Sequence, residues 1–190
     1  MAEMLEFSPV TLKDHSSLDP FLKEYGSASC QHSFPAMLGL KAKYGDEFCF
    51  VDDVLFIHRS LLDHDGFRVY LAPLGNISRD FDRNISILLD DAHCHHARVS
   101  FETVTGEFKD MLSSAMPDTF EADYVRDMSE YLYSVSDLSR LSGKALAAKR
   151  NRVGAFFSAY SGRVRIEDIN SSNIGDVHEF TLRYFITGLI

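Results

Sequence analysis

The sequence predicts a mixed α/β or α+β protein, and two features of its pattern lead to that class. Short runs rich in Val, Ile, Phe and Tyr, bounded by Asp, Gly or Pro, are interspersed with longer segments whose apolar residues recur every three or four positions. The first pattern is typical of β-strands and the second of amphipathic helices. Because the two kinds of segment do not alternate strictly, the pattern does not indicate a regular series of strand–helix–strand units.

The N-terminal segment predicts a short strand followed by two helices. Thr11 and Asp14 have the spacing of an imperfect capping box, which opens a helix, and Gly26 follows the last apolar residue of that helix. Residues 29–44 carry apolar side chains at helical spacing, and Gly45 ends that stretch.

The middle of the chain is rich in strands. Residues 47–59 consist of two β-type runs that meet at Asp52-Asp53, and because Asp favours turns we expect a hairpin there. Residues 67–71 form a further strand, which ends before Pro73. The remaining expected elements are a helix over 78–91, a strand over 98–101, a helix over 103–115, an extended segment over 120–133, a helix over 142–160, a strand over 163–166 and a helix over 173–185.

Length and composition are those of a soluble globular protein with one large or two small domains. The chain has 190 residues, 45% of them hydrophobic, including 15 Phe and 8 Tyr. A chain of this length can bury a core large enough to need neither a disulfide nor a metal ion. The formal net charge of −9 argues against general adhesion to nucleic acids or membrane surfaces. Any contact with tRNA or anionic lipid must therefore be local.

Cysteine usage and the N-terminal residues predict a cytoplasmic protein. Cys30, Cys49 and Cys94 are odd in number and scattered, which favours reduced thiols over a disulfide framework. The first residues lack the basic start and apolar run of a signal peptide. No apolar stretch reaches the roughly 20 residues of a membrane-spanning helix, so no transmembrane segment is expected.

A dense group of cations interrupts this acidic sequence. Arg140, Lys144, Lys149, Arg150 and Arg152 lie close together, and no acidic residue follows until well beyond them. We call residues 137–152 the basic segment. Such a group can be solvated, can pair with carboxylates of the fold itself, or can receive an anionic ligand.

The basic segment also predicts a helix that begins at Ser142. The Ser142 hydroxyl can cap the helix, with Gly143 and Lys144 in its first turn. Lys149 falls within the apolar stripe of this helix and must either reach past it or meet a carboxylate or a ligand at its margin. With its neighbours Arg150 and Asn151, it could hold a phosphate or a carboxylate. The expected stripe consists of Leu146, Val153, Phe156, Phe157 and Tyr160.

The basic segment carries a resemblance to a known family. Written as Asp-Leu-x-x-Leu-Ser-Gly-Lys-x-Leu-x-x-Lys-Arg-Asn, it resembles a signature of a bacterial family of unknown function that is related to the C-terminal domain of phosphatidylglycerol lysyltransferase. Weaker similarities are the opening Phe-x-Pro-Val-Thr-Leu-x-Asp, the run Ala72-Pro73-Leu74-Gly75, and Asp123-Tyr124 with Glu130 and the residues after it. Together they extend from about residue 7 to about residue 170.

The resemblance implies an acyltransferase-like fold and a transfer reaction. The family is similar to tandem GNAT-like domains, as in Fem-type peptidyltransferases, and the implied activity is aminoacyl (lysyl-type) transfer from charged tRNA to a lipid or peptide acceptor. Lys144, Lys149, Arg150 and Asn151 match the motif and are the expected anion-binding residues, for tRNA phosphate or a lipid headgroup. Arg152 departs from the usual motif. The resemblance identifies no catalytic residue and no cofactor.

The same resemblance implies a domain division. Residues 1–135 would form an N-terminal GNAT-like domain, 136–161 a basic connecting helix, and 162–190 the start of a second, incomplete GNAT-like domain. We expect either a truncated family member or one that pairs with another chain, so activity of this chain alone stays open. The alternative is a non-catalytic binding or assembly module. It could form a homo-oligomer through the apolar tail that contains Phe180, Phe185 and Ile190.

Other candidate chemistry has weaker support. His93-Cys94-His95-His96 contains metal-ligand residue types, but no second pair has zinc spacing, and histidines that complement a helix C-terminus explain the run better. We predict no metal site. Cys30 and His32 are two residues apart and would not face each other on a helix. The P-loop pattern, the pattern Gly-x-Gly-x-x-Gly and the Gly-rich turn by which GNAT enzymes bind acetyl-CoA are all absent.

Overall fold

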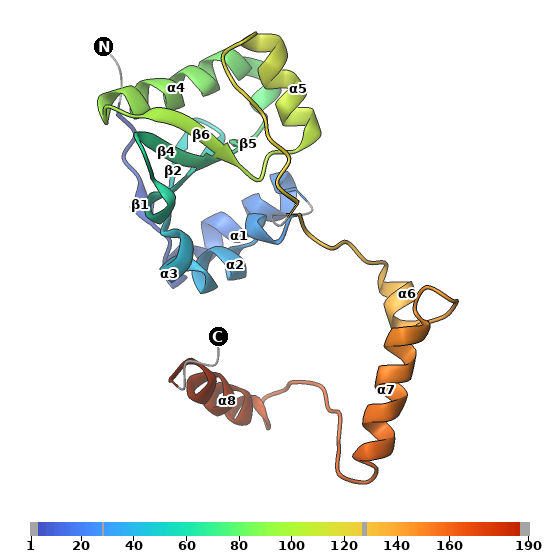
Figure 1. Ribbon diagram of the computed structural model, residues 1–190. Helices are drawn as coiled ribbons and strands as arrows, with labels where there is room; N and C mark the ends of the chain where they lie inside the picture. Colours follow the sequence, from blue (N-terminus) through green and yellow to red (C-terminus); the bar gives the residue numbers. More distant parts are fainter. Residues whose placement is uncertain (1–3, 28, 127–128, 187–190) are drawn as a thin grey trace. The chain divides into compact units, whose positions relative to one another are not determined.

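The computed structural model describes residues 4–27, 29–126 and 129–186, with side chains as far as Arg183 (Figure 1). The chain divides into two compact units, Met1–Glu130 and Tyr131–Ile190, which are called the first and second unit below. Each is described by itself. The predicted division at residues 135 and 161 stays a prediction.

The first unit is built on a mixed sheet. The strand order is β1-β2-β3-β4-β6, and β5 pairs with β3. All neighbouring strands are antiparallel except β4 and β6, which are parallel. The predicted mixed α/β class is therefore confirmed, and the architecture is compatible with an α+β acyltransferase-like fold. The strands are β1 (Ser8–Pro9), β2 (Asp46–Val51), β3 (Val54–Arg59), β4 (Phe67–Leu71), β5 (Leu74–Gly75) and β6 (Arg98–Glu102).

Helices cover the sheet, and short 3-10 turns lead into several of them. The first unit contains α1 (His15–Tyr25), α2 (Phe34–Gly39), α3 (Lys41–Tyr44), α4 (Phe81–Cys94) and α5 (Gly106–Ala115). The 3-10 turns are η1 (Leu12–Asp14), η2 (Cys30–His32), η3 (Ser60–Leu62) and η4 (Ile77–Asp80). The second unit contains α6 (Val135–Arg140), α7 (Ala147–Ala159) and α8 (Ile174–Ile186).

Several local predictions are confirmed. The Thr11 amide and hydroxyl both donate to the Asp14 carboxylate, at 2.8 and 2.7 Å, and this box opens the turn before α1. The hairpin turns at Asp52-Asp53, where Asp52 adopts a φ of 51°. Gly45 ends α3 with a φ of 63°, a left-handed conformation that glycine adopts at little cost.

The expected continuous helix over residues 29–44 is wrong. The chain forms η2, α2 and α3 instead, because Ser33 is extended, with φ −129° and ψ 139°, and interrupts the helical backbone. Pro35 then occupies the first turn of α2, where its missing N–H costs nothing.

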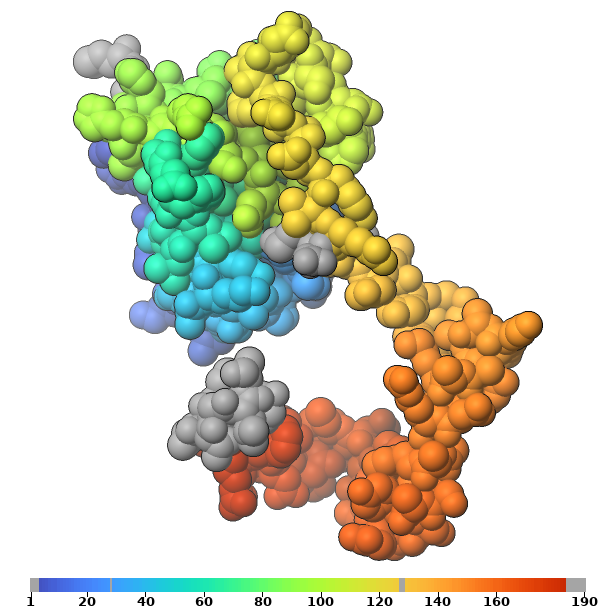
Figure 2. Space-filling view, in the orientation of Figure 1, coloured from blue at the N-terminus to red at the C-terminus, as the bar shows by residue number. Residues whose placement is uncertain are grey.

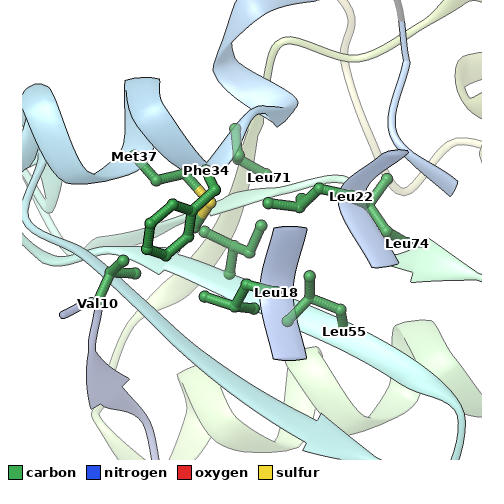
Figure 3. Close-up of a cluster of buried hydrophobic side chains, with 9 residues drawn as sticks. Val10, Leu18, Leu22, Phe34, Met37, Leu55, Leu71 and Leu74 are labelled. Atoms are coloured by element: carbon green, nitrogen blue, oxygen red, sulfur yellow. The ribbon is translucent and has the colours of Figure 1, made fainter. Parts of the chain in front are cut away.

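Alternation along β3 divides the core between the two faces of the sheet. Leu55 and Ile57 face α1 and α2, where they pack with Leu18 of α1 and Phe34 of α2 (Figure 3). The side chains of the intervening residues point to the opposite face of the sheet. There the cluster comprises Val54, Phe56, Tyr70, Leu88, Ala92 and Val99.

β4 and β5 pair with the same strand, but in different registers. Tyr70 of β4 lies opposite His58, whereas Leu74 of β5 lies opposite Leu55, so one extra residue is accommodated at Ala72-Pro73. Such a bulge bends a strand and redirects it. As a result β5 continues along β3. The pairing of β4 with β6 ends at Leu71 of β4, which lies opposite Glu102 of β6.

After α5 an extended segment runs over the surface of the first unit (yellow in Figure 2). The Phe120 ring packs on that of Phe101, with the centroids 5.7 Å apart. At the end of the unit the Glu130 carboxylate accepts hydrogen bonds from the Ser29 hydroxyl at 2.6 Å and from the Cys30 amide at 2.9 Å. These contacts fix the segment to η2.

The second unit lacks a buried core among its described residues. Every described side chain in it is exposed or partly exposed. The apolar stripe expected on its basic helix is about half exposed, with Val153 at 45% and Phe156 at 47%. The expected strand over 163–166 is wrong, because residues 164–170 have no pairing strand within the described part of this unit and so lack the hydrogen bonds of a sheet.

A fully buried arginine connects the elements of the first unit. Arg59 Nε lies 3.3 Å from Asp46 Oδ1, and its Nη1 donates to Glu102 Oε2 at 3.2 Å. The guanidinium carbon is 4.2 Å from the centroid of the Tyr44 ring. These contacts join β3 to β2, β6 and α3.

Replacing Arg59 by Ala is expected to lower the unfolding free energy by about 3–5 kcal/mol, because it leaves the buried Asp46 carboxylate and the partly buried Glu102 carboxylate without their counter-charge. Urea denaturation followed by circular dichroism measures the loss. Arg83→Ala is the control, because Arg83 forms an exposed ion pair with Asp52 at 2.8 Å and such pairs contribute about 0–1 kcal/mol. Equal losses in the two variants would contradict the role given to Arg59.

The stability of the protein should depend on the titration of Asp46. Burial raises the pKa of Asp46 from 3.8 to about 6, against the opposing attraction of Arg59. The folded state thus binds this proton more tightly than the unfolded chain, so its contribution to stability is full below pH 3.8 and is lost as pH rises through 6. Urea unfolding from pH 4 to 7 should show this decline for the wild type and less of it for Asp46→Asn. Parallel pH profiles would refute the assignment.

Candidate anion-binding site

The four predicted site residues lie in the second unit, on and just before α7. The helix begins at Ala147 and not at Ser142 as the sequence predicts. Leu141 and Gly143 both have left-handed backbone, with φ of 47° and 81°, so the chain turns there after α6. Lys144 therefore lies in a turn, while Lys149, Arg150 and Asn151 lie in the first turns of α7.

Arg150 holds this turn in place. Its Nη1 donates to the carbonyl oxygens of Leu141 and, at 3.3 Å, of Gly143. The guanidinium thus satisfies carbonyl groups at the end of α6, where a cation also complements the helix dipole. Its Nε and Nη2 have no hydrogen-bond partner among the described residues, so part of the guanidinium stays available to a ligand.

Lys149 lies over an aromatic ring. Its Nζ is 5.4 Å from the centroid of the Tyr133 ring, within the range of a cation–π interaction. Tyr133 in turn stacks with Tyr131, with the centroids 6.2 Å apart. The described neighbour of Lys149 is thus an aromatic ring, and the predicted carboxylate or ligand stays a prediction.

The cations of the basic segment are not neutralised by the unit that carries them. Lys144 and Asn151 are exposed, and no hydrogen bond joins either of them to Lys149 or Arg150. Within the described residues of the second unit, ion pairs form at Arg165–Glu167 and at Arg183–Glu179, and none involves a cation of the basic segment. The segment therefore presents uncompensated positive charge to solvent. Whether it binds an anion stays a prediction.

The run of histidines ends a helix. α4 ends at Cys94, and His95 Nδ1 lies 2.8 Å from the Asp91 carbonyl oxygen in the last turn. This position agrees with the interpretation that histidines complement the helix C-terminus. Across the described ranges, no group of three or more His, Cys, Asp or Glu side chains is placed to hold a metal ion.

Cys30 and His32 have separate partners. The Cys30 thiol lies 3.3 Å from Glu130 Oε1, and that hydrogen bond raises the thiol pKa, which disfavours the thiolate needed for nucleophilic attack. His32 Nδ1 instead accepts a hydrogen bond from the Ser27 amide at 3.1 Å. The two side chains do not form a nucleophile–base pair.

Sequence reasoning missed a cleft in the first unit. A cleft of about 370 Å³ is lined by His32, by residues 72–75 and by the start of α5. The only sequence signal was the run Ala72-Pro73-Leu74-Gly75, which stood out for its family resemblance and not for a chemical role.

The family comparison is decisive for the class of the protein. The model of the family "Phosphatidylglycerol lysyltransferase, C-terminal" matches residues 22–183. The chain belongs to this family. Family membership points to a function related to lysyl transfer. The basic segment and the cleft both lie within the matched range, and no curated protein sequence matches the chain.

A solved structure shares the fold of this family member. It is the crystal structure of a conserved protein of unknown function from Bacteroides thetaiotaomicron VPI-5482, with 23% sequence identity and a TM-score of 0.81. The match covers 97% of this chain and 60% of that protein, so the chain spans less than two thirds of its length.

Two further expectations concern membrane insertion and the oligomer interface. No helix in the described ranges is both long and apolar enough to cross a bilayer. Phe180 is 68% exposed on α8. The Phe185 side chain and Ile190, which complete the expected apolar tail, lie outside the described part of the chain. The predicted homo-oligomer and cytoplasmic location stay predictions.

Removing the Arg150 side chain should loosen the turn before α7. The Leu141 amide donates to the Asp137 carbonyl at 2.8 Å, so its hydrogen exchange reports on this turn. Arg150→Ala is expected to speed that exchange about five-fold, as loss of about 1 kcal/mol of hydrogen bonding would. Arg152→Ala removes an exposed charge without a described partner and should leave the rate unchanged. Equal rates in both variants would show that Arg150 does not hold the turn.

Proposed function

We propose that the chain takes part in aminoacyl transfer, moving a lysyl-type aminoacyl group from charged tRNA to a lipid or peptide acceptor. The observation that carries the proposal is the family match over residues 22–183, which includes the whole basic segment. The uncompensated charge of that segment supports it, because both a tRNA and an anionic lipid present phosphate groups.

The reaction needs no cofactor and no covalent enzyme intermediate. The acceptor oxygen or nitrogen attacks the ester carbonyl carbon that links the amino acid to the tRNA ribose. The new acyl bond forms, the ester C–O bond breaks, and the proton lost by the acceptor passes to the ribose oxygen. Holding two such substrates in line supplies much of the rate enhancement of a transfer reaction.

In this proposal the basic segment binds phosphate. Lys144 and Lys149 supply ammonium groups, and Arg150 supplies the N–H groups that its turn contacts leave available. Asn151 adds an amide donor on the next position of α7. Because the whole protein has a net charge of −9, this binding is confined to the segment and is sensitive to salt.

The alternative is a non-catalytic binding or assembly module. The exposure of Phe156 and Phe157 on α7, at 47% and 46%, favours this possibility, because large apolar side chains at a surface mark contact regions. Transfer of labelled lysine from lysyl-tRNA to phosphatidylglycerol distinguishes the two. An enzyme forms the product, whereas a module binds without forming it.

Loss of two lysines of the basic segment should weaken phosphate binding. Lys144→Ala/Lys149→Ala is expected to lower the affinity for lysyl-tRNA or for phosphatidylglycerol vesicles about ten-fold. It should also reduce the slope of log affinity against log salt by about 2 for a nucleic acid ligand. Filter binding and vesicle sedimentation measure the two ligands separately. The charge-matched control is Lys13→Ala/Lys109→Ala in the first unit, and unchanged binding by the basic-segment variant would remove the assigned role.

A further inference from the structure

Two exposed tyrosines form a stacked pair just before the basic segment. The ring centroids of Tyr131 and Tyr133 lie 6.2 Å apart, with an angle of 12° between the ring planes. Both residues lie in the irregular segment before α6, and Tyr131 is 86% exposed. Because only Tyr133 stacks with Tyr131 among the described residues, much of the Tyr131 ring is open to solvent. We call these two residues the tyrosine pair.

A cation of the basic segment adjoins the tyrosine pair. Lys149 Nζ lies 5.4 Å from the centroid of the Tyr133 ring, and no ion pair joins Lys149 to a carboxylate within the described ranges. Neither tyrosine hydroxyl forms a hydrogen bond with the part of the chain that the structure describes. The pair thus combines accessible aromatic surface with positive charge that the unit itself does not neutralise.

This combination suits a single-stranded nucleic acid. Unpaired bases stack on aromatic side chains, while cations beside the rings contact the phosphates of the same strand. A base inside a duplex has both faces covered by its neighbours, so an internal base pair offers no face to Tyr131. An anionic bilayer also attracts cations, but it has no flat ring to stack on an aromatic side chain. A preference for bases therefore separates the two kinds of partner.

We propose that the tyrosine pair is a stacking platform for unpaired bases of an RNA whose phosphates contact the basic segment. A base lies on the open face of Tyr131, and Lys149 contacts a phosphate of the same strand. The platform accepts different bases, because every base has a ring face. This inference rests on the proposed function for its class of ligand, RNA, and adds that part of the bound RNA is single-stranded.

The test compares two RNA probes of equal charge with the whole chain at one salt concentration. Hexa-adenylate has unpaired bases, and a ribose-phosphate strand of the same length has none. Fluorescence anisotropy should show that hexa-adenylate binds about ten-fold more tightly, as one stacked base can supply. Hexa-adenylate should also shift the Tyr131 ring protons upfield in NMR spectra. Equal affinities, or no saturable binding of hexa-adenylate, would overturn the proposal.

Exposed tyrosines provide matched variants. Tyr131→Ala should bind hexa-adenylate no more tightly than the base-free strand, whereas Tyr131→Phe keeps the ring and should bind like the wild type. Tyr124→Ala is the control, because Tyr124 is 83% exposed and belongs to the first unit. Lys144→Ala/Lys149→Ala should weaken binding of both strands. A base preference that survives in Tyr131→Ala would refute the platform.

Two further measurements identify the partner and separate this inference from the proposed function. If Tyr131→Ala weakened binding to phosphatidylglycerol vesicles and left hexa-adenylate binding unchanged, the pair would serve a membrane and the proposal would fail. A base preference that depends on Tyr131, without transfer of lysine from lysyl-tRNA, would support the platform and count against the transfer reaction. Lysine transfer together with a base preference that persists in Tyr131→Ala would count against the platform alone.

Discussion

The burial of Arg59 is the constraint on which the rest of the first unit depends. An arginine without solvent must keep its counter-charges, and these come from elements far apart in the sequence, namely Asp46 on β2 and Glu102 on β6. Asp46 lies directly opposite Arg59 in the β2–β3 register. A slip of one residue would move every side chain of the strand to the other face and leave the charge unpaired. The ion pairs and the apolar core therefore specify the same register.

That register also explains why the cleft exists. After the bulge at Ala72-Pro73, Leu74 of β5 packs into the same apolar cluster as Leu55 of β3. β5 therefore stays paired with β3, and the sheet opens beside β6. η2 lies beside this opening, where the Thr103 hydroxyl donates to Gln31 at 3.3 Å and Glu130 binds the first residues of the turn. The turn that carries His32 is thus held at the cleft wall by two residues distant in the sequence, Thr103 and Glu130.

The two units use charge in different ways. The first unit contains buried ion pairs, such as that of Arg59 with Asp46, and these are part of its stability. In the second unit, the cations of the basic segment contact main-chain carbonyls and an aromatic ring, as Arg150 and Lys149 show. Neither kind of partner carries a full negative charge. A net positive patch therefore persists on an acidic protein, and this is the physical basis of the proposed local phosphate binding.

The sequence by itself determined the features that depend on neighbours in the chain. It predicted the capping box at Thr11, the hairpin at Asp52-Asp53, the stop at Gly45 and, through its motif, the family. Only the structure decided where the basic helix begins, because left-handed backbone at Leu141 and Gly143 and the contacts of Arg150 form a turn before it. Only the tertiary structure decided which polar groups are buried, because burial depends on long-range contacts. Glu130 and Cys30, for example, are 100 residues apart and meet only in the folded chain. No local pattern marks such a pair.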